Sequence, residues 1–204
     1  MTIIEIDTPP GTARAHLHAA TAPLAALVLG HGAGGGIEAP DLVASSEAAR
    51  SNDISVALVE QPYRVAGRRS PTGASQLDAA WTAVVEELRA NELGELPLIV
   101  GGRSLGARIA CRTAEAIGAI AVLCLAFPLE PPPRRGKPPQ TRLAELDAVT
   151  VPTLVVQGER DPFGIPPPGP TREVVTVPGD HGLKADLEAV AAAVRAWLPR
   201  VVAP

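Results

Sequence analysis

Apolar and polar positions repeat with two different periods along this chain of 204 residues, and each period predicts one kind of element. Short apolar runs rich in β-branched residues are typical of buried strands, whereas apolar positions three and four apart are typical of amphipathic helices. The strand-like runs cover residues 3–6, 26–29, 55–59, 98–100, 120–125, 153–156 and 173–177. The clearest helical patterns are Leu77, Ala80, Trp81, Val84, Val85, Leu88 and Leu187, Val190, Val194, Trp197, Leu198.

The order of these elements predicts the architecture. Strands that alternate with helices form a mostly parallel sheet with helices on both faces. We therefore expect an α/β fold with a sheet of about seven strands, in a single domain that spans residues 1–204. Loops that leave the carboxyl ends of parallel strands carry the chemistry of such folds. Two Pro-rich stretches, 128–139 and 162–170, are expected to be loops as well.

Charge and apolar run lengths exclude several classes of partner. The net charge is −4, so no basic field would attract nucleic acid or an anionic membrane. No signal peptide is recognisable, and the longest apolar run, 119–127, is too short to span a bilayer. Cys111 and Cys124 lie in apolar runs without metal-ligand spacing and are expected to be buried free thiols. These features favour a cytoplasmic protein with a small-molecule substrate, and they leave the oligomeric state open.

A candidate nucleophile lies between an expected strand and an expected helix. Residues 101–106 read GGRSLG, a G-x-S-x-G pattern centred on Ser104. A sharp strand-to-helix turn at the serine needs small neighbours, and Gly102 and Gly106 provide them. The pattern therefore predicts that the hydroxyl of Ser104 is exposed at the end of the strand.

A serine nucleophile needs a base, and the base needs a carboxylate to orient it. Of the four histidines only His181 follows Ser104, and it lies in a glycine-flanked loop after the last expected strand. Asp161 is the preferred acid, because it leaves the preceding strand just beyond residue 158. Glu159 and Asp180 are the alternatives, but Asp180 adjoins His181 and would have difficulty reaching its ring.

Acyl transfer also needs donors for the oxyanion, usually backbone N–H groups. The glycine-rich loop 30–36 follows the second expected strand and can supply one of them. We expect the donors to be the amides of Leu105 and Ala33, with the amide of Gly34 as the alternative to that of Ala33. His31 precedes the serine and is interpreted as a structural residue of this loop.

Several basic side chains gather on loops at the same edge of the sheet. Tyr63, Arg64 and Arg103 are candidates to contact the substrate, and guanidinium groups would suit an acid-bearing one. Arg68 and Arg69 belong to the same group, and Arg134, Arg135 and Lys137 are expected to approach it from the next loop. The alternative is that these are solvated or ion-paired structural arginines.

The glycine loop admits a second interpretation. Gly30, Gly32 and Gly35 match a dinucleotide-binding fingerprint, and Glu60 ends the next strand near the position of a ribose-binding acid. Against it, Pro40 delays the start of the helix beyond the third glycine. This interpretation also leaves the serine, acid and histidine pattern unexplained.

With these residues placed, the chain resembles the α/β-hydrolase superfamily, and most closely its small dienelactone-hydrolase-like serine hydrolases. The resemblance runs from about Leu24 to the last helix and rests on HGAGGG (31–36), PYRVAGRRSP (62–71), GGRSLG (101–106), AFPLEPP (126–132), QGERDPFG (157–164) and GDHGLK (179–184). Dienelactone hydrolases proper carry a cysteine where this chain has Ser104. The resemblance is therefore to the fold and the triad, and it does not name a substrate.

The resemblance implies a serine hydrolase with the triad Ser104, Asp161 and His181, which cleaves a carboxylic ester or thioester and needs no metal or organic cofactor. Residues 128–141 are too few for a cap domain, so the site should be open and long-chain lipase activity is disfavoured. Lactonase and peptidase activities stay open. The alternative from another class is a catalytically silent binding or scaffold protein on the same fold.

Overall fold

The structure, a computed structural model, describes residues 1–131 and 140–203. Along this part of the chain the elements are β1 (Thr2–Thr8), β2 (Gly11–His18), β3 (Ala25–Gly30), α1 (Pro40–Arg50), β4 (Ile54–Glu60), α2 (Pro62–Val65), α3 (Ala74–Leu88), the π-helical turn η1 (Arg89–Leu93), β5 (Leu98–Arg103), α4 (Leu105–Thr113), β6 (Ala121–Leu125), α5 (Leu143–Asp147), β7 (Thr153–Gly158), β8 (Arg172–Val177) and α6 (Leu187–Val202).

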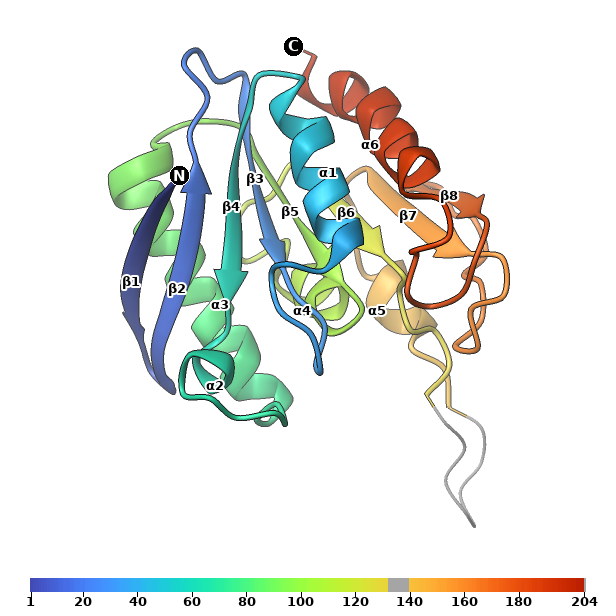
Figure 1. Ribbon diagram of the computed structural model, residues 1–204, viewed down its shortest axis with the longest axis horizontal. Helices are drawn as coiled ribbons and strands as arrows, with labels where there is room; N and C mark the ends of the chain where they lie inside the picture. Colours follow the sequence, from blue (N-terminus) through green and yellow to red (C-terminus); the bar gives the residue numbers. More distant parts are fainter. Residues whose placement is uncertain (132–139, 204) are drawn as a thin grey trace.

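The strands form one sheet in the order β1-β2-β4-β3-β5-β6-β7-β8 (Figure 1). Strands β3 to β8 pair in parallel, and β2 is antiparallel to both β1 and β4. The prediction of a mostly parallel sheet is confirmed, with β2 as an additional strand. Its buried side carries Ala13, Ala15 and Leu17, which alternate with Arg14, His16 and His18. Two of the three buried side chains are alanines, so the apolar signal of this strand is weak.

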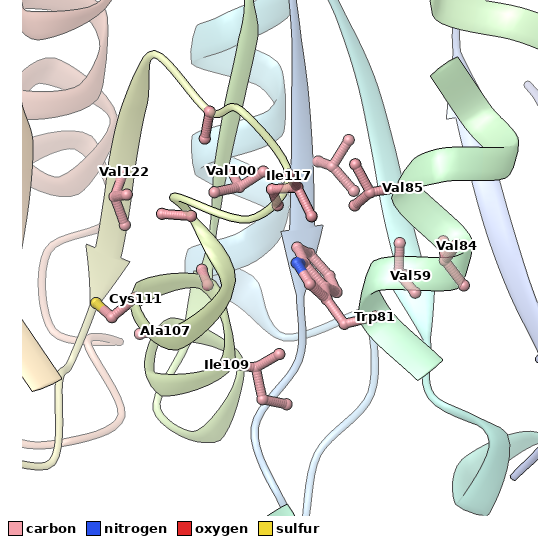
Figure 2. Packing of buried hydrophobic residues seen from close by; sticks show 14 of the residues in the cluster. Val59, Trp81, Val84, Val85, Val100, Ala107, Ile109, Cys111, Ile117 and Val122 are labelled. Atoms are coloured by element: carbon pink, nitrogen blue, oxygen red, sulfur yellow. The ribbon is translucent and has the colours of Figure 1, made fainter. Parts of the chain in front are cut away.

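Helices cover both faces of the sheet (Figure 1). One core contains residues of α3 and α4, and the other contains residues of α1 and α6. Successive residues of β3 alternate between the two, so Val28 belongs to the first core and Leu27 to the second. Figure 2 shows the fully buried Trp81 of α3 in one cluster with the sheet residues Val59 and Val100. Strands covered on both faces read as continuous apolar runs, which is why the sequence revealed them.

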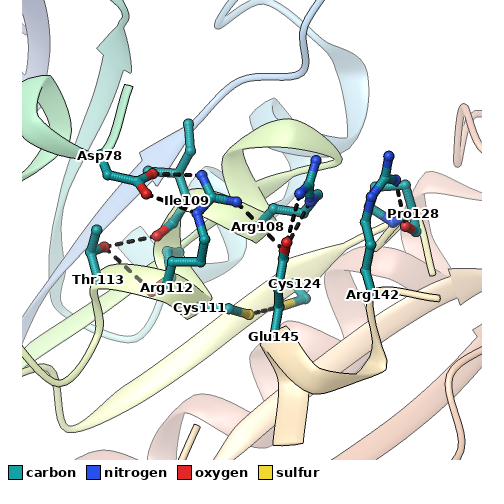
Figure 3. A network of polar contacts seen from close by, with 11 residues as sticks. Asp78, Arg108, Ile109, Cys111, Arg112, Thr113, Cys124, Pro128, Arg142 and Glu145 are labelled. Atoms are coloured by element: carbon teal, nitrogen blue, oxygen red, sulfur yellow. Dashed lines mark hydrogen bonds and ion pairs between the residues drawn. The ribbon is translucent and has the colours of Figure 1, made fainter. Parts of the chain in front are cut away.

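Polar contacts hold α4, the helix that follows Ser104, to its neighbours (Figure 3). Arg108 binds Glu145 of α5 through two hydrogen bonds of 2.9 and 2.6 Å, and Arg112 binds Asp78 of α3. Cys111 of α4 lies 3.5 Å from a cysteine of β6, sulfur to sulfur. Both thiols are buried and free, as expected.

The carboxyl ends of four parallel strands supply the loops with the candidate site residues. Loop 31–36 follows β3, Ser104 follows β5, Asp161 follows β7 and His181 follows β8. Within the described residues, no helix or strand lies between the end of β6 and the start of α5, in agreement with the expected lack of a cap domain. Among residues 1–131 and 140–203, no helix combines the length and the apolar character needed to cross a membrane.

Candidate active site

Ser104 occupies a strained backbone position between β5 and α4. Its φ of 52° and ψ of −105° lie in a region that non-glycine residues seldom adopt. Its N–H donates a 2.9 Å hydrogen bond to the carbonyl of Leu125 at the end of β6. A Cβ at Gly102 or at Gly106 would collide with the carbonyl oxygen of Gly30. Both glycines are therefore required for the end of β3 to approach the serine turn.

Ser104, His181 and Asp161 form a continuous chain of hydrogen bonds. The Oγ of Ser104 lies 3.0 Å from Nε2 of His181, and Nδ1 of His181 lies 2.8 Å from Oδ2 of Asp161. Because a carboxylate only accepts, Nδ1 carries the proton and Nε2 is left to accept from the serine hydroxyl. The side chain of Asp161 is fully buried, while that of His181 is 18% exposed.

The buried carboxylate of Asp161 is held by three groups. Besides His181, it accepts hydrogen bonds from the amide of Phe163 (2.9 Å) and from Nε2 of Gln157 (2.8 Å). The Gln157 amide nitrogen also lies 3.1 Å from the carbonyl of Phe127 and 2.9 Å from that of Gly164. Gln157 did not emerge from the sequence, although a single polar residue at the end of the apolar run of β7 was an available signal.

The two alternative acids lie elsewhere. Glu159 is exposed, and Asp180 accepts a hydrogen bond from the amide of Gly182 at 2.9 Å.

The ring of Phe163 packs edge-on against the imidazole of His181, with 4.5 Å between the ring centroids. Phe163 is a second residue that the sequence did not single out.

The loop after β3 lies directly beside the serine. A Cβ built on Gly32 would come 3.6 Å from the Cβ of Ser104. The amide of Gly35 closes a turn onto the carbonyl of Gly32 at 3.2 Å. None of the hydrogen bonds found among residues 1–131 and 140–203 uses the N–H of Ala33 or of Leu105, so both amides remain available as donors.

His31 fixes the conformation of this loop through hydrogen bonds at both ring nitrogens. Its Nδ1–H donates to the carbonyl of Gly32 at 2.9 Å, and its Nε2 accepts from the amide of Gln61 at 3.2 Å. The side chain is buried, and burial lowers its pKa, so the imidazole is neutral. With both ring nitrogens engaged, His31 acts as the structural residue that the sequence predicted.

Two of the three predicted substrate contacts are occupied within the protein. Tyr63 is buried and donates its hydroxyl to the carbonyl of Ala33 at 2.9 Å. Arg103 forms an ion pair with Asp41 of α1 and donates to the carbonyl of His181 at 2.8 Å. Arg64 is half-buried, and no side-chain hydrogen bond or ion pair joins it to the described residues. Arg134, Arg135 and Lys137 lie outside the described residues.

The dinucleotide interpretation finds no support in this geometry. Helix α1 begins only at Pro40, and Gly30 packs against Trp81 and Gly106 rather than opening a helix toward a phosphate. Glu60 pairs with Nε2 of His16 at 2.9 Å.

Solved structures with this fold include several hydrolases. The chain superposes with a TM-score of 0.78 on XC6422 from Xanthomonas campestris, described as an α/β serine hydrolase without lid, at 18% identity over 98% of this chain and 94% of that one. Est1E from Butyrivibrio proteoclasticus with bound ferulic acid gives 0.76, at 19% identity over 98% and 100% of the chains. A dienelactone hydrolase from Anabaena variabilis gives 0.76, at 16% identity over 98% and 97%.

Sequence comparison gives the family directly. No curated protein sequence matches the chain significantly. A family model described as an alpha/beta hydrolase domain, however, matches residues 23–185, a range that includes Ser104, Asp161 and His181. Because this match covers well over half of the chain, the protein belongs to the alpha/beta hydrolase domain family.

Proposed function

We propose that this protein is a serine hydrolase that cleaves a carboxylic ester or thioester of a small, water-soluble substrate through an acyl-enzyme. The observation that carries the proposal is the hydrogen-bond chain from Ser104 through His181 to the buried Asp161, with distances of 3.0 and 2.8 Å. A protein that only binds has no need of a serine on a strained turn, a base within reach of it and an acid behind that base.

Each member of this chain has a defined role in the proposed reaction. The Oγ of Ser104 attacks the substrate carbonyl while Nε2 of His181 takes its proton. Asp161 stabilises the imidazolium that forms, and the N–H groups of Leu105 and Ala33 stabilise the oxyanion. His181 then protonates the leaving group, and water repeats the sequence to release the acid.

The surroundings of the triad favour a small substrate. The described residues between β6 and α5 form no helix or strand that could cover a long acyl chain. Tyr63 and Arg103 are engaged within the protein, so Arg64 is the remaining predicted contact for an acid-bearing substrate. The ring of Phe163 beside His181 provides an apolar surface near the reacting atoms.

A fluorophosphonate probe tests the nucleophile. We expect labelling of the wild type and of Ser75→Ala, an exposed serine of α3 that serves as a matched control, and no labelling of Ser104→Ala. Turnover of p-nitrophenyl acetate should fall by about 10⁴-fold or more in Ser104→Ala. Labelling that persists in Ser104→Ala contradicts the assignment. A wild type that is neither labelled nor active favours a binding or scaffold protein instead.

A further inference from the structure

One guanidinium joins three segments that meet at the triad. Nε of Arg103 lies 3.0 Å from Oδ2 of Asp41 in the first turn of α1. Its Nη2 donates a 2.8 Å hydrogen bond to the backbone carbonyl of His181, 78 residues away in the chain. Its Nη1 would lie only 2.8 Å from a Cβ at Gly32. Arg103 itself directly precedes Ser104, so this side chain also belongs to the serine turn.

The charge of Asp41 explains why the guanidinium stays in place. The side chain of Asp41 is fully buried, and this burial raises the pKa of its carboxyl group, whereas the positive charge of the neighbouring Arg103 lowers that pKa. Among the described residues, Asp41 has no other ion pair. A buried carboxylate is stable only with a partner, and so the position of Arg103 is fixed by Asp41. The same side chain, fixed in this way, then reaches the loop of His181.

We propose that Arg103 is a positioning residue, which sets the distance between the His181 loop, the loop at Gly32 and the serine turn. This inference rests on the proposed function. Arg103 holds the base through its backbone carbonyl, while Asp161 holds the ring. A Cβ at position 32 would come within 2.8 Å of Nη1 and 3.6 Å of the Cβ of Ser104, so the guanidinium lies directly against the oxyanion loop beside the serine. A displacement of about 1 Å between reacting groups can cost about 100-fold in rate.

Arg103→Lys separates positioning from simple neutralisation of Asp41. A lysine ammonium can still pair with Asp41, but it lacks the planar fork that reaches the His181 carbonyl at the same time. Arg108→Lys is the matched control, because Arg108 is a partly buried arginine of α4 whose guanidinium pairs with Glu145 of α5 and not with a side chain of the triad. Should Arg103→Lys fail to fold, the double variant Arg103→Met with Asp41→Asn removes both charges and leaves no unpaired one.

The first readout is kinetic. We expect Arg103→Lys to lower kcat toward p-nitrophenyl acetate by about 10- to 100-fold, with KM changed less than about 2-fold, and Arg108→Lys to leave both constants unchanged. A normal kcat in Arg103→Lys overturns the proposal. A higher KM with normal kcat also overturns it, because Arg103 would then bind the substrate.

The second readout does not depend on turnover. The proton on Nδ1 of His181 and the ring ¹⁵N shifts report the imidazole directly by NMR. We expect them to shift or broaden in Arg103→Lys and to stay unchanged in Arg108→Lys. If the wild type is inactive and unlabelled, the proposed function fails, and these resonances still decide the role of Arg103. Unchanged resonances in Arg103→Lys, or equal changes in both variants, overturn the proposal.

Discussion

The hydroxyl of Tyr63 donates a 2.9 Å hydrogen bond to the carbonyl of Ala33, which joins the short helix α2 to the loop beside Ser104. The two residues lie 30 positions apart in the chain. Since the carbonyl and the N–H of Ala33 belong to adjoining peptide planes, fixing the carbonyl limits the direction in which the N–H can point. A tyrosine expected to contact the substrate is therefore placed to orient a proposed oxyanion donor.

Tyr63→Phe removes only this hydrogen bond. A hydrogen bond of this kind contributes about 1 kcal/mol net, so we expect a loss of about 1 kcal/mol in the free energy of unfolding. If the N–H of Ala33 then stabilises the oxyanion in the transition state by about 1 kcal/mol less, kcat falls by about 5-fold. Urea titration and the kinetics of p-nitrophenyl acetate hydrolysis measure the two effects.

Burial raises the pKa of Tyr63 to about 12, which gives this prediction an internal control. The hydroxyl stays protonated, and so remains a donor, throughout the range from about pH 7 to about pH 10. The ratio of wild-type to Tyr63→Phe activity should therefore be constant over that range. A ratio that approaches one at the alkaline end contradicts the assigned role.

His31 makes the stability of the fold depend on pH. Burial lowers its pKa, so below about pH 6.5 the unfolded chain binds a proton that the folded protein resists. Stability should therefore fall as the pH drops below about 6.5, with a slope of at most about 1.4 kcal/mol per pH unit from this group, until the lower folded pKa is reached. Urea unfolding at about pH 7.5 and about pH 5.5 measures the loss.

Replacement of His31 by asparagine should remove most of this acid sensitivity, because asparagine does not titrate. His18 is the matched control: its pKa is lowered too, first by burial and then by Arg50, but it is less buried. His18→Asn should therefore take away a smaller part of the slope. Equal acid sensitivity in the wild type and His31→Asn would show that His31 is not the responsible group.

The strands and the order of the triad residues were predictable because both are written in local patterns. A strand covered on two faces needs a continuous apolar run, and β3, β4, β5, β6 and β7 each show one. Ser104 and Asp161 each follow such a strand, and His181 follows the edge strand β8, so the parallel topology brings all three to one edge of the sheet.

The partners of individual side chains were not predictable in this way. Arg103 was a candidate substrate contact because it lies with other arginines on loops at one edge of the sheet, yet its partner is Asp41 of α1, far away along the chain. Tyr63 likewise meets Ala33 only once β3 and β4 are paired. Gln157 supports Asp161 through a side-chain direction that is set by packing rather than by sequence spacing.

Gly106→Ala has two opposing effects on the free energy of unfolding, and they differ in size. In a helix, alanine is favoured over glycine by up to about 1 kcal/mol, which by itself predicts a gain in stability. The added Cβ, however, would collide with the backbone carbonyl of Gly30 and lie 3.0 Å from that of His31, and backbone atoms in a packed sheet cannot yield easily. Overpacking costs about 1–3 kcal/mol or more, so we expect a net loss of stability and of fluorophosphonate labelling.

Gly34→Ala is the control for this clash, because a Cβ at Gly34 meets nothing within 4 Å and the residue has no positive φ. Its free energy of unfolding should stay within about 0.5 kcal/mol of the wild type. A stabilised Gly106→Ala would mean that β3 and α4 do not approach as closely as the structure places them.

Asp161→Asn tests which carboxylate orients His181. The Oδ2 of Asp161 accepts from both His181 and Gln157, so an asparagine amide nitrogen placed there would face two donors. If His181 then carries its proton on Nε2, its Nδ1 can accept from the asparagine N–H, but Nε2 can no longer take the proton of Ser104. We expect kcat to fall by about 10³- to 10⁴-fold with little change in KM.

Asp180→Asn is the matched control, since asparagine can still accept from the amide of Gly182, and its kcat should stay within about 2-fold of the wild type. The reverse pattern, with activity lost in Asp180→Asn and retained in Asp161→Asn, would transfer the orienting role to the acid next to the histidine.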